Sequence, residues 1–149
     1  MTYVVDASVA VKWFVRENLH DQALLLLDHG DLLQAPDLVV PEVANIAWKK
    51  CIRGEIPDLQ ARAIATAMCQ YIPTLHPAVG LVERALDIAL MLNHPVYDCL
   101  YLACAEEAAG PLITADERLY ETIHDTEFAP LVRHLEDPDF LTAEHPAPA

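Results

Sequence analysis

The sequence predicts an α/β fold: a three-layer α/β/α sandwich around a mainly parallel central sheet. Short runs of strand-forming apolar residues alternate with longer segments whose apolar residues recur at helical spacing. A chain of 149 residues suffices for one domain with its own core, and 54% hydrophobic residues with four glycines favour a compact, helix-rich domain. No internal repeat or linker divides the chain. We therefore expect one domain over residues 1–136 and a loose tail over residues 137–149, where proline, alanine and acidic residues gather.

The first strand organises the rest of the prediction. Tyr3–Val5 has the strand propensity of a short, buried parallel strand. Ser8 stands where an N-cap residue would open the next helix, an apolar segment over 9–15. Asp6 is then left at the carboxyl end of the strand, the edge of an open α/β sheet where ligands bind. An isolated aspartate here would be interpreted as a turn residue. A functional role for Asp6 therefore depends on other acidic residues that lie beside it.

The remaining elements follow in alternation. Helices are expected over 19–29, 38–53, 59–69, 78–92 and 97–109, with a short one after Asp116, and strands over 32–35, 71–76, 111–114 and within 128–132. Gly30 and Gly110 are expected to follow two helix ends, and Pro41 to lie in the first turn of another helix. Pro73 suits a strand at the edge of the sheet.

The charge balance is strongly acidic. The chain has 9 Lys and Arg against 23 Asp and Glu, a formal net charge of −14, which argues against non-specific nucleic-acid binding through a broad basic face. The basic cluster of Lys49, Lys50 and Arg53 is interpreted as a solvated helix end, where cations suit the helix dipole. A chain this acidic also suits a basic protein partner.

Several features favour a cytoplasmic protein. No apolar run approaches the roughly 20 residues that a membrane span needs, and the N-terminus has no secretory signal pattern, so we expect neither a membrane segment nor export. The four cysteines lack C-x-x-C spacing and lie in helical patterns. We expect them to be buried thiols in a reducing compartment rather than a disulfide framework or a zinc site.

Four acidic residues lie at positions that suit a shared site. Asp116 follows an apolar strand as Asp6 does, and if both strands are central and parallel, the two carboxylates share one crevice. Glu42 and Asp98 lie in the first turns of helices, where an acid is common simply because the helix dipole favours it. Glu42 and Asn45 are three residues apart on one helical face, so an acid and an amide project together.

The segments around these acids resemble the motifs of PIN-domain ribonucleases, in particular the VapC-like toxins of toxin–antitoxin pairs. The matching segments, in the family's order and usual spacing, are Asp6–Ser8, Pro41–Asn45, Tyr97–Ala103 and Thr114–Leu119. The resemblance covers residues 1–132. It implies an acidic quartet with supporting polar groups: Asp6, Glu42, Asp98 and Asp116, with Ser8, Asn45 and Thr114. It also implies a PIN-like sandwich, RNA cleavage with Mg²⁺ or Mn²⁺, a homodimer and a cognate antitoxin.

Carboxylate oxygens are the hard ligands that Mg²⁺ and Mn²⁺ prefer. We expect Asp6 and Asp98 to bind metal directly, Asp116 to bind it directly or through water, and Glu42 to bind it or to orient the attacking water. Four acids suit one ion or two. His76 and His94 lie beside prolines and are interpreted as ordinary surface residues, so no histidine is expected to act as a general base.

Two other functions stay open. The chain also fits a non-catalytic, acidic PIN-fold module that binds a basic protein partner. The second open function is that of a phosphoryl-transfer domain with Asp6 as nucleophile, although Ser8 stands where that chemistry usually has a second acid. The apolar residues 24–27, Trp13, Phe14 and Trp48 are interpreted mostly as core, with a homodimer or antitoxin surface covering any that a monomer leaves exposed.

Overall fold

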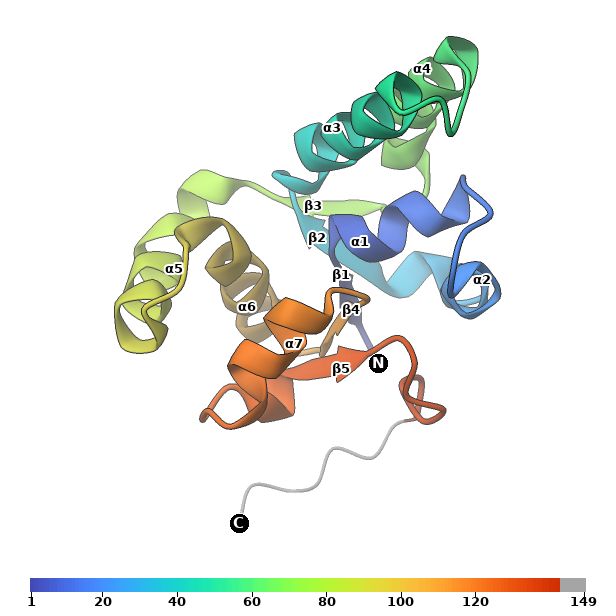
Figure 1. The fold of residues 1–149 in the computed structure, drawn as a ribbon. Helices are drawn as coiled ribbons and strands as arrows, with labels where there is room; N and C mark the ends of the chain where they lie inside the picture. The colour runs from blue at the N-terminus through green and yellow to red at the C-terminus, as the bar shows by residue number, and fades with distance from the viewer. Residues whose placement is uncertain (143–149) are drawn as a thin grey trace.

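The computed structural model describes residues 1–142, whose five strands form one fully parallel sheet in the order β3-β2-β1-β4-β5. The strands are β1 (Tyr3–Val5), β2 (Leu33–Pro36), β3 (Thr74–His76), β4 (Leu112–Thr114) and β5 (Val132–His134). This confirms the predicted α/β class and places the strand that follows Pro73 at an edge (Figure 1).

Helices cover both faces of the sheet. They are α1 (Ala7–Ala10), α2 (His20–Leu27), α3 (Val39–Ile52), α4 (Asp58–Ala67), α5 (Ala78–Leu92), α6 (Val96–Ala108) and α7 (Glu117–His124), with short 3-10 helices η1 (Val11–Trp13), η2 (Gly30–Leu32), η3 (Met68–Gln70) and η4 (Ala129–Leu131). Figure 1 shows α5 and α6 on one side of the sheet and α1 and α2 on the other. The three layers are those that the sequence predicts.

The order of the strands determines where a ligand would bind. The chain leaves β1 towards β2 and β3, then returns to the other side of β1 with β4 and β5. Such a reversal leaves a crevice at the carboxyl ends of the two strands that flank it, here β1 and β4. The pairing of Val4 with Leu112 and of Val5 with Ile113 sets the register. Continued by one residue, this register places Asp6 beside Thr114.

Helix α6 is the central helix of its layer. Its residues Cys99 to Ala105 are all buried, because α6 lies between the sheet and α5. Asp98 begins this buried stretch at the edge of the core. All four cysteines are free thiols; Cys99 and Cys104 are buried as predicted, whereas Cys69 is exposed.

No single helix within residues 1–142 is long and apolar enough to cross a membrane. Helices α5 and α6 reach the required length and composition only as a pair, and that pair is bent by 116°.

Two predicted helix ends are wrong. Ala109, not Gly110, takes the left-handed conformation after α6, with φ of 52°, and the Gly110 N–H donates to the Ala105 carbonyl at 3.2 Å. Gly110 is required for a different reason, since a Cβ atom there would overlap the carbonyl oxygen of Thr2. Gly30 does not end α2; it opens η2.

The last strand also differs from the prediction, because residues 129–131 form η4 and β5 begins at Val132. Part of the segment expected to be a loose tail packs against the sheet. Phe140 is buried, the Tyr3 hydroxyl donates to the Leu141 carbonyl at 3.0 Å, and the Arg133 guanidinium donates to the Phe140 carbonyl at 2.9 Å. The rest of the predicted tail, residues 143–149, lies outside the described residues.

Candidate active site

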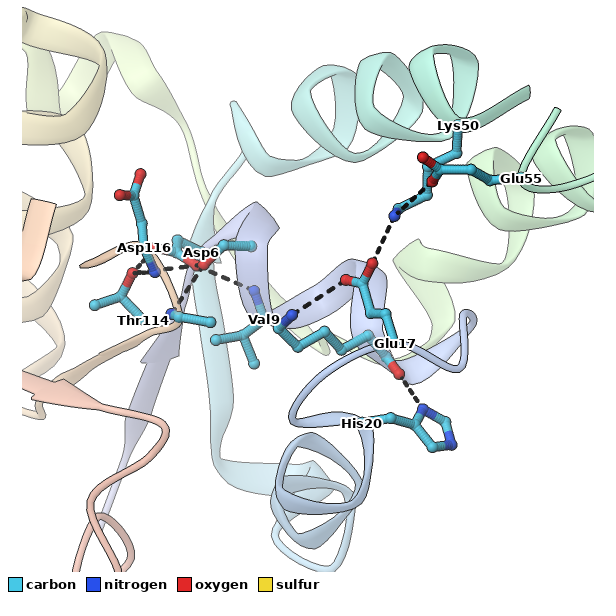
Figure 2. A network of polar contacts seen from close by, with 11 residues as sticks. Asp6, Val9, Glu17, His20, Lys50, Glu55, Thr114 and Asp116 are labelled. Atoms are coloured by element: carbon cyan, nitrogen blue, oxygen red, sulfur yellow. Dashed lines mark hydrogen bonds and ion pairs between the residues drawn. The ribbon is translucent and has the colours of Figure 1, made fainter. Parts of the chain in front are cut away.

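Asp6 lies at the crevice between β1 and β4, and three donors hold its carboxylate. The Ser8 hydroxyl donates to Oδ1 at 2.5 Å, the Val9 N–H donates to the same oxygen at 3.2 Å, and the Thr114 hydroxyl donates to Oδ2 (Figure 2). Asp6 is only 5% exposed. A buried carboxylate requires such donors, because each one replaces a hydrogen bond lost from water.

The predicted N-cap at Ser8 is wrong, and the correction changes the role of the serine. Asp6 caps α1, while Ser8 lies inside this short helix. The Ser8 oxygen accepts from the Ala115 N–H at 2.9 Å while its proton goes to Asp6. Ser8 therefore joins the end of β1 to the end of β4, as does Thr114, and both hydroxyls hold the Asp6 carboxylate.

Burial raises the pKa of Asp6 to about 6, against an ordinary value of 3.8. The hydrogen bonds from Ser8, Thr114 and Val9 act in the opposite direction, and the charge of Asp116 raises the pKa further. Asp116 caps α7 by accepting from the Leu119 N–H at 3.1 Å, and its side chain is exposed. The two aspartates that follow central strands are thus electrostatically coupled, as expected for residues that share one crevice.

Glu42 reaches the same region from the first turn of α3. The hydroxyl of the buried Tyr101 donates to Glu42 Oε1 at 2.6 Å. Burial raises the pKa of Glu42; the Tyr101 hydrogen bond lowers it, and the charge of Asp98 raises it. Tyr101 is a residue that the sequence analysis missed, although its position one helical turn after Asp98 is a signal that could have found it.

The Tyr101 hydroxyl, which is bonded to Glu42, also responds to the charges of acids on other elements. Its pKa is raised by burial and then by the charges of Glu42, Asp6 and Asp98. Three of the four predicted acids therefore lie close enough to this hydroxyl to act on it, and the fourth, Asp116, acts on Asp6. Asp6 and Asp116, more than one hundred residues apart in the sequence, lie at the neighbouring ends of β1 and β4.

Asp98 has a partner that the sequence analysis misinterpreted. The Asp98 Oδ2 atom lies 2.6 Å from His94 Nε2, and the His94 side chain is only 14% exposed. His94 is therefore not an ordinary surface residue. His76 is not one either, because its Nε2 atom lies 2.6 Å from Gln34 Oε1. His94 lies before α6 and is followed by Pro95, so helical spacing gave no signal for this contact.

The side chains of this site are of the chemical type that a divalent cation prefers as ligands. They are carboxylates in two coupled pairs, Asp6 with Asp116 and Glu42 with Asp98, and the mutual repulsion in each pair is what a bound cation relieves. Within residues 1–142, however, no three acidic, histidine or cysteine side chains are grouped closely enough to hold a metal ion as they stand. The side chains would have to move to share one ion.

The two lysines of the basic cluster at the end of α3, Lys49 and Lys50, differ in their ion pairing. The Lys50 ammonium pairs with Glu17 at 2.5 Å and Glu55 at 3.3 Å, and Glu17 also pairs with Lys12 at 3.1 Å (Figure 2). Lys50 is thus part of a network that joins α3 to the segment after η1, which corrects the prediction of a solvated cluster. Lys49 is exposed and forms no ion pair within residues 1–142.

The sequence matches a family model described as PIN domain over residues 3–124. Ribonuclease VapC3 of Pyrobaculum aerophilum is 32% identical over 123 residues, which is 81% of this chain and 94% of that protein. The VapC ribonuclease Mb0985 of Mycobacterium bovis is 31% identical over 119 residues, 80% of this chain and 89% of its own. Ribonuclease VapC1 of Mycobacterium tuberculosis is 31% identical over 118 residues, 78% of this chain and 86% of its own.

A solved structure agrees with this fold. The crystal structure of PAE2754 from Pyrobaculum aerophilum superposes with a TM-score of 0.67 and 22% identity, covering 91% of this chain and 85% of that one. At this identity the likeness concerns the fold. The family match spans nearly all the described residues and every predicted acid, so this chain belongs to the PIN-domain family.

Proposed function

We propose that the protein is a Mg²⁺- or Mn²⁺-dependent endoribonuclease and the toxin of a toxin–antitoxin pair. The observation that carries the proposal is the neighbouring position of Asp6 and Asp116 at the carboxyl ends of β1 and β4, with Glu42 held at 2.6 Å by the Tyr101 hydroxyl. The ends of these two strands form the sheet edge where α/β folds bind ligands. The names of the relatives, VapC ribonucleases, supply the reaction.

The residues that would hold the cation are the four carboxylates, Asp6, Glu42, Asp98 and Asp116. The chemistry that such a cation supplies when bound is the stabilisation of charge that develops on the phosphodiester. The side chains around the acids limit how each one can turn. Ser8 and Thr114 engage both oxygens of Asp6, whereas Tyr101 engages Oε1 of Glu42 and leaves Oε2 available.

We assign Glu42 Oε2 as the atom that accepts the proton of the attacking water. The raised pKa of Glu42 suits a general base, since a carboxylate that binds a proton more readily than usual accepts one better near neutral pH. The Tyr101 hydrogen bond fixes the direction of that oxygen. Asp98 is oriented in the same way by His94, a few residues earlier in the chain.

The test is incubation of purified protein with single-stranded and structured RNA in Mg²⁺, in Mn²⁺ and in chelator. We expect cleavage with either metal and none in chelator. Cleavage that survives chelator would overturn the metal-dependent mechanism. If several RNAs stay intact in both metals while a basic partner protein binds tightly, the protein is the binding module instead, the function that the net charge of −14 favours.

The Tyr101→Phe variant tests the positioning of Glu42. It removes the donor at 2.6 Å and leaves the ring in its buried place. We expect kcat for RNA cleavage to fall by about tenfold to a hundredfold with KM nearly unchanged, because the hydrogen bond orients a reacting group rather than the substrate.

The matched control for Tyr101→Phe is Tyr3→Phe. Tyr3 is also buried and its hydroxyl also donates one hydrogen bond, to the Leu141 carbonyl, but it lies at the start of β1, the end of the strand opposite Asp6. Both variants should lose about 1 kcal/mol of unfolding free energy. Equal kcat values in the two variants would exclude a positioning role for Tyr101.

We propose a cognate antitoxin and a second copy of the chain as partners, and the cytoplasm as the location, in keeping with four free thiols. Trp13 is core, as predicted, but Trp48 is 55% exposed and Leu25 is 48% exposed. Further apolar side chains on one helix, α5, are exposed: Val79, Val82, Leu86, Leu90 and Met91. Such surface is typical of interfaces. A monomeric mass by light scattering would contradict the homodimer.

A further inference from the structure

A cleft of about 370 Å³ opens directly beside Glu42. One face of α3 supplies Glu42, Asn45 and Lys49, which follow one another at intervals of one helical turn. Leu38 and Ile46 add apolar surface, and Tyr97 closes the cleft from the start of α6. The volume is within the range of small-ligand sites, and the lining combines apolar surface with a few polar groups, as such sites do.

Tyr97 is an exposed aromatic residue next to a proposed catalytic acid. Its side chain is 67% exposed, whereas Tyr101 one turn later is buried in the core. A large ring left in solvent contributes little to folding, but an exposed aromatic face is the usual platform on which an unpaired nucleic-acid base stacks. Because Tyr97 lines the same cleft as Glu42, a base on this ring would bring its own phosphate close to that acid.

Lys49 supplies a positive charge at the same cleft. Although carboxylates greatly outnumber cations in this chain, no acidic side chain within residues 1–142 pairs with Lys49. The helix dipole explains a cation in the last turn of α3, where Lys49 lies. The dipole does not explain why Lys49 lines the cleft beside Glu42. An anionic ligand bound in this cleft would explain both the place of Lys49 in the lining and the absence of an ion pair within the described residues.

We propose that this cleft binds one unpaired nucleotide of single-stranded RNA, next to the phosphodiester to be cleaved. The base stacks on Tyr97, the Asn45 amide donates to or accepts from the base edge or sugar, and Lys49 contacts a neighbouring phosphate. The proposal rests on the ribonuclease function above and adds the side chains that would receive the nucleotide, Tyr97, Asn45 and Lys49. A duplex should fit less well, since its bases are already stacked on one another.

Binding measured without cleavage tests the cleft. The dissociation constant of a fluorescently labelled, ten-nucleotide single-stranded RNA is measured by anisotropy in chelator, over a series of salt concentrations. We expect Tyr97→Ala to weaken binding at least about fivefold and Tyr97→Phe to change it less than about twofold, because phenylalanine keeps the stacking face. The same RNA annealed to its complement should bind more weakly than the single strand.

Lys49→Gln should also weaken binding, and it should reduce the slope of log Kd against log salt by about 0.7, the loss of one phosphate contact to a single strand. The matched control is Arg53→Gln. Arg53 is exposed at the end of the same helix and does not line the cleft, and its substitution removes the same charge. It should leave both the Kd and the slope near the parent's values.

These outcomes distinguish failure of the proposed nucleotide site from failure of the proposed ribonuclease function. Unchanged binding in Tyr97→Ala, equal effects of Lys49→Gln and Arg53→Gln, or no RNA binding by the parent would each overturn the cleft as a nucleotide site. Cleavage whose KM is indifferent to Tyr97 and Lys49 would also overturn it, but would leave the ribonuclease function standing. RNA binding with the expected dependence, in a protein that cleaves nothing with Mg²⁺ or Mn²⁺, would remove the ribonuclease function and leave the cleft.

Discussion

The Asp6→Asn variant is expected to cleave RNA at least about a hundredfold more slowly than the parent, yet its metal-free form should be the more stable of the two at pH 7.5. The reason is that Asp6 is buried and must be ionised at this pH. Asparagine has the same shape without the charge. Its amide can still bond to Ser8 and Thr114, because each hydroxyl can rotate to donate or to accept.

The pH dependence of this difference follows from the raised pKa of Asp6. A carboxyl group that binds its proton more tightly in the folded state contributes stability that is fully present below the unfolded pKa near 3.8 and is lost as pH rises through about 6. For Asp6 alone the loss amounts to as much as about 3 kcal/mol. The gain of Asp6→Asn over the parent should therefore be small near pH 4 and grow until about pH 7.

Urea unfolding in chelator at pH 4.5 and pH 7.5 measures this difference. Asp116→Asn is the matched control, because Asp116 also caps a helix but is exposed, so that its charge stays hydrated. This second variant should lose cleavage with a much smaller pH-dependent gain in stability, because the charge of Asp116 raises the pKa of Asp6 less than burial does. If Asp6→Asn is less stable than the parent at pH 7.5, Asp6 serves the fold as a helix cap more than it serves a metal site.

The Asp98→Asn variant is expected to abolish cleavage and to remove most of the stabilisation that a divalent cation gives. At a cation concentration of about one hundred times the dissociation constant, binding should add roughly 2.7 kcal/mol to the parent, a rise of several degrees in Tm. Without metal, the variant should be at least as stable as the parent, because Glu42 loses a repelling neighbour. The amide oxygen of the asparagine can still accept a hydrogen bond from His94.

Thermal unfolding with Mg²⁺, with Mn²⁺ and with chelator checks this second expectation. Asp58→Asn is its matched control: Asp58 is also an acid in the first turn of a helix and pairs with Arg62 four residues later, but it is exposed and belongs to α4. Mg²⁺ should raise the Tm of Asp58→Asn as much as that of the parent. An equal rise in Asp98→Asn would show that Asp98 is not a ligand.

The elements that could be predicted from the sequence are those set by local pattern. Helix α5 has the bounds that its apolar spacing predicts, Ala78–Leu92, and the strands β2 and β4 lie where short apolar runs stand between turn residues. The class and the parallel sheet follow from the alternation of strands and helices. The family resemblance was carried by ordered motifs, and the family match confirms it.

The errors arise where two neighbouring residues can serve the same purpose. Asp6 and Ser8 are both good N-cap residues, and the choice between them depends on Thr114 and Ala115, which meet them only in the folded sheet. Ala109 and Gly110 compete in the same way for the left-handed position, and the approach of Thr2 decides it. Contacts so distant in sequence leave no local signal.

The site was predictable in its acids and not in the side chains that orient them. Carboxylates after strands and in first turns of helices can be recognised from sequence, but a tyrosine within an apolar helix is usually core, and Tyr101 is both core and a donor to Glu42. His94 was dismissed because prolines often accompany surface turns. Its partner Asp98 became evident only with the geometry of the turn into α6.

The neighbouring positions of β1 and β4 bear on when the protein can become active. The second of these strands is made more than one hundred residues after the first, yet the two together form the crevice. A nascent chain therefore lacks the site until Thr114 and Asp116 have emerged from the ribosome. For an enzyme that cuts RNA, we expect this order of synthesis to delay cleavage until both strands have been made.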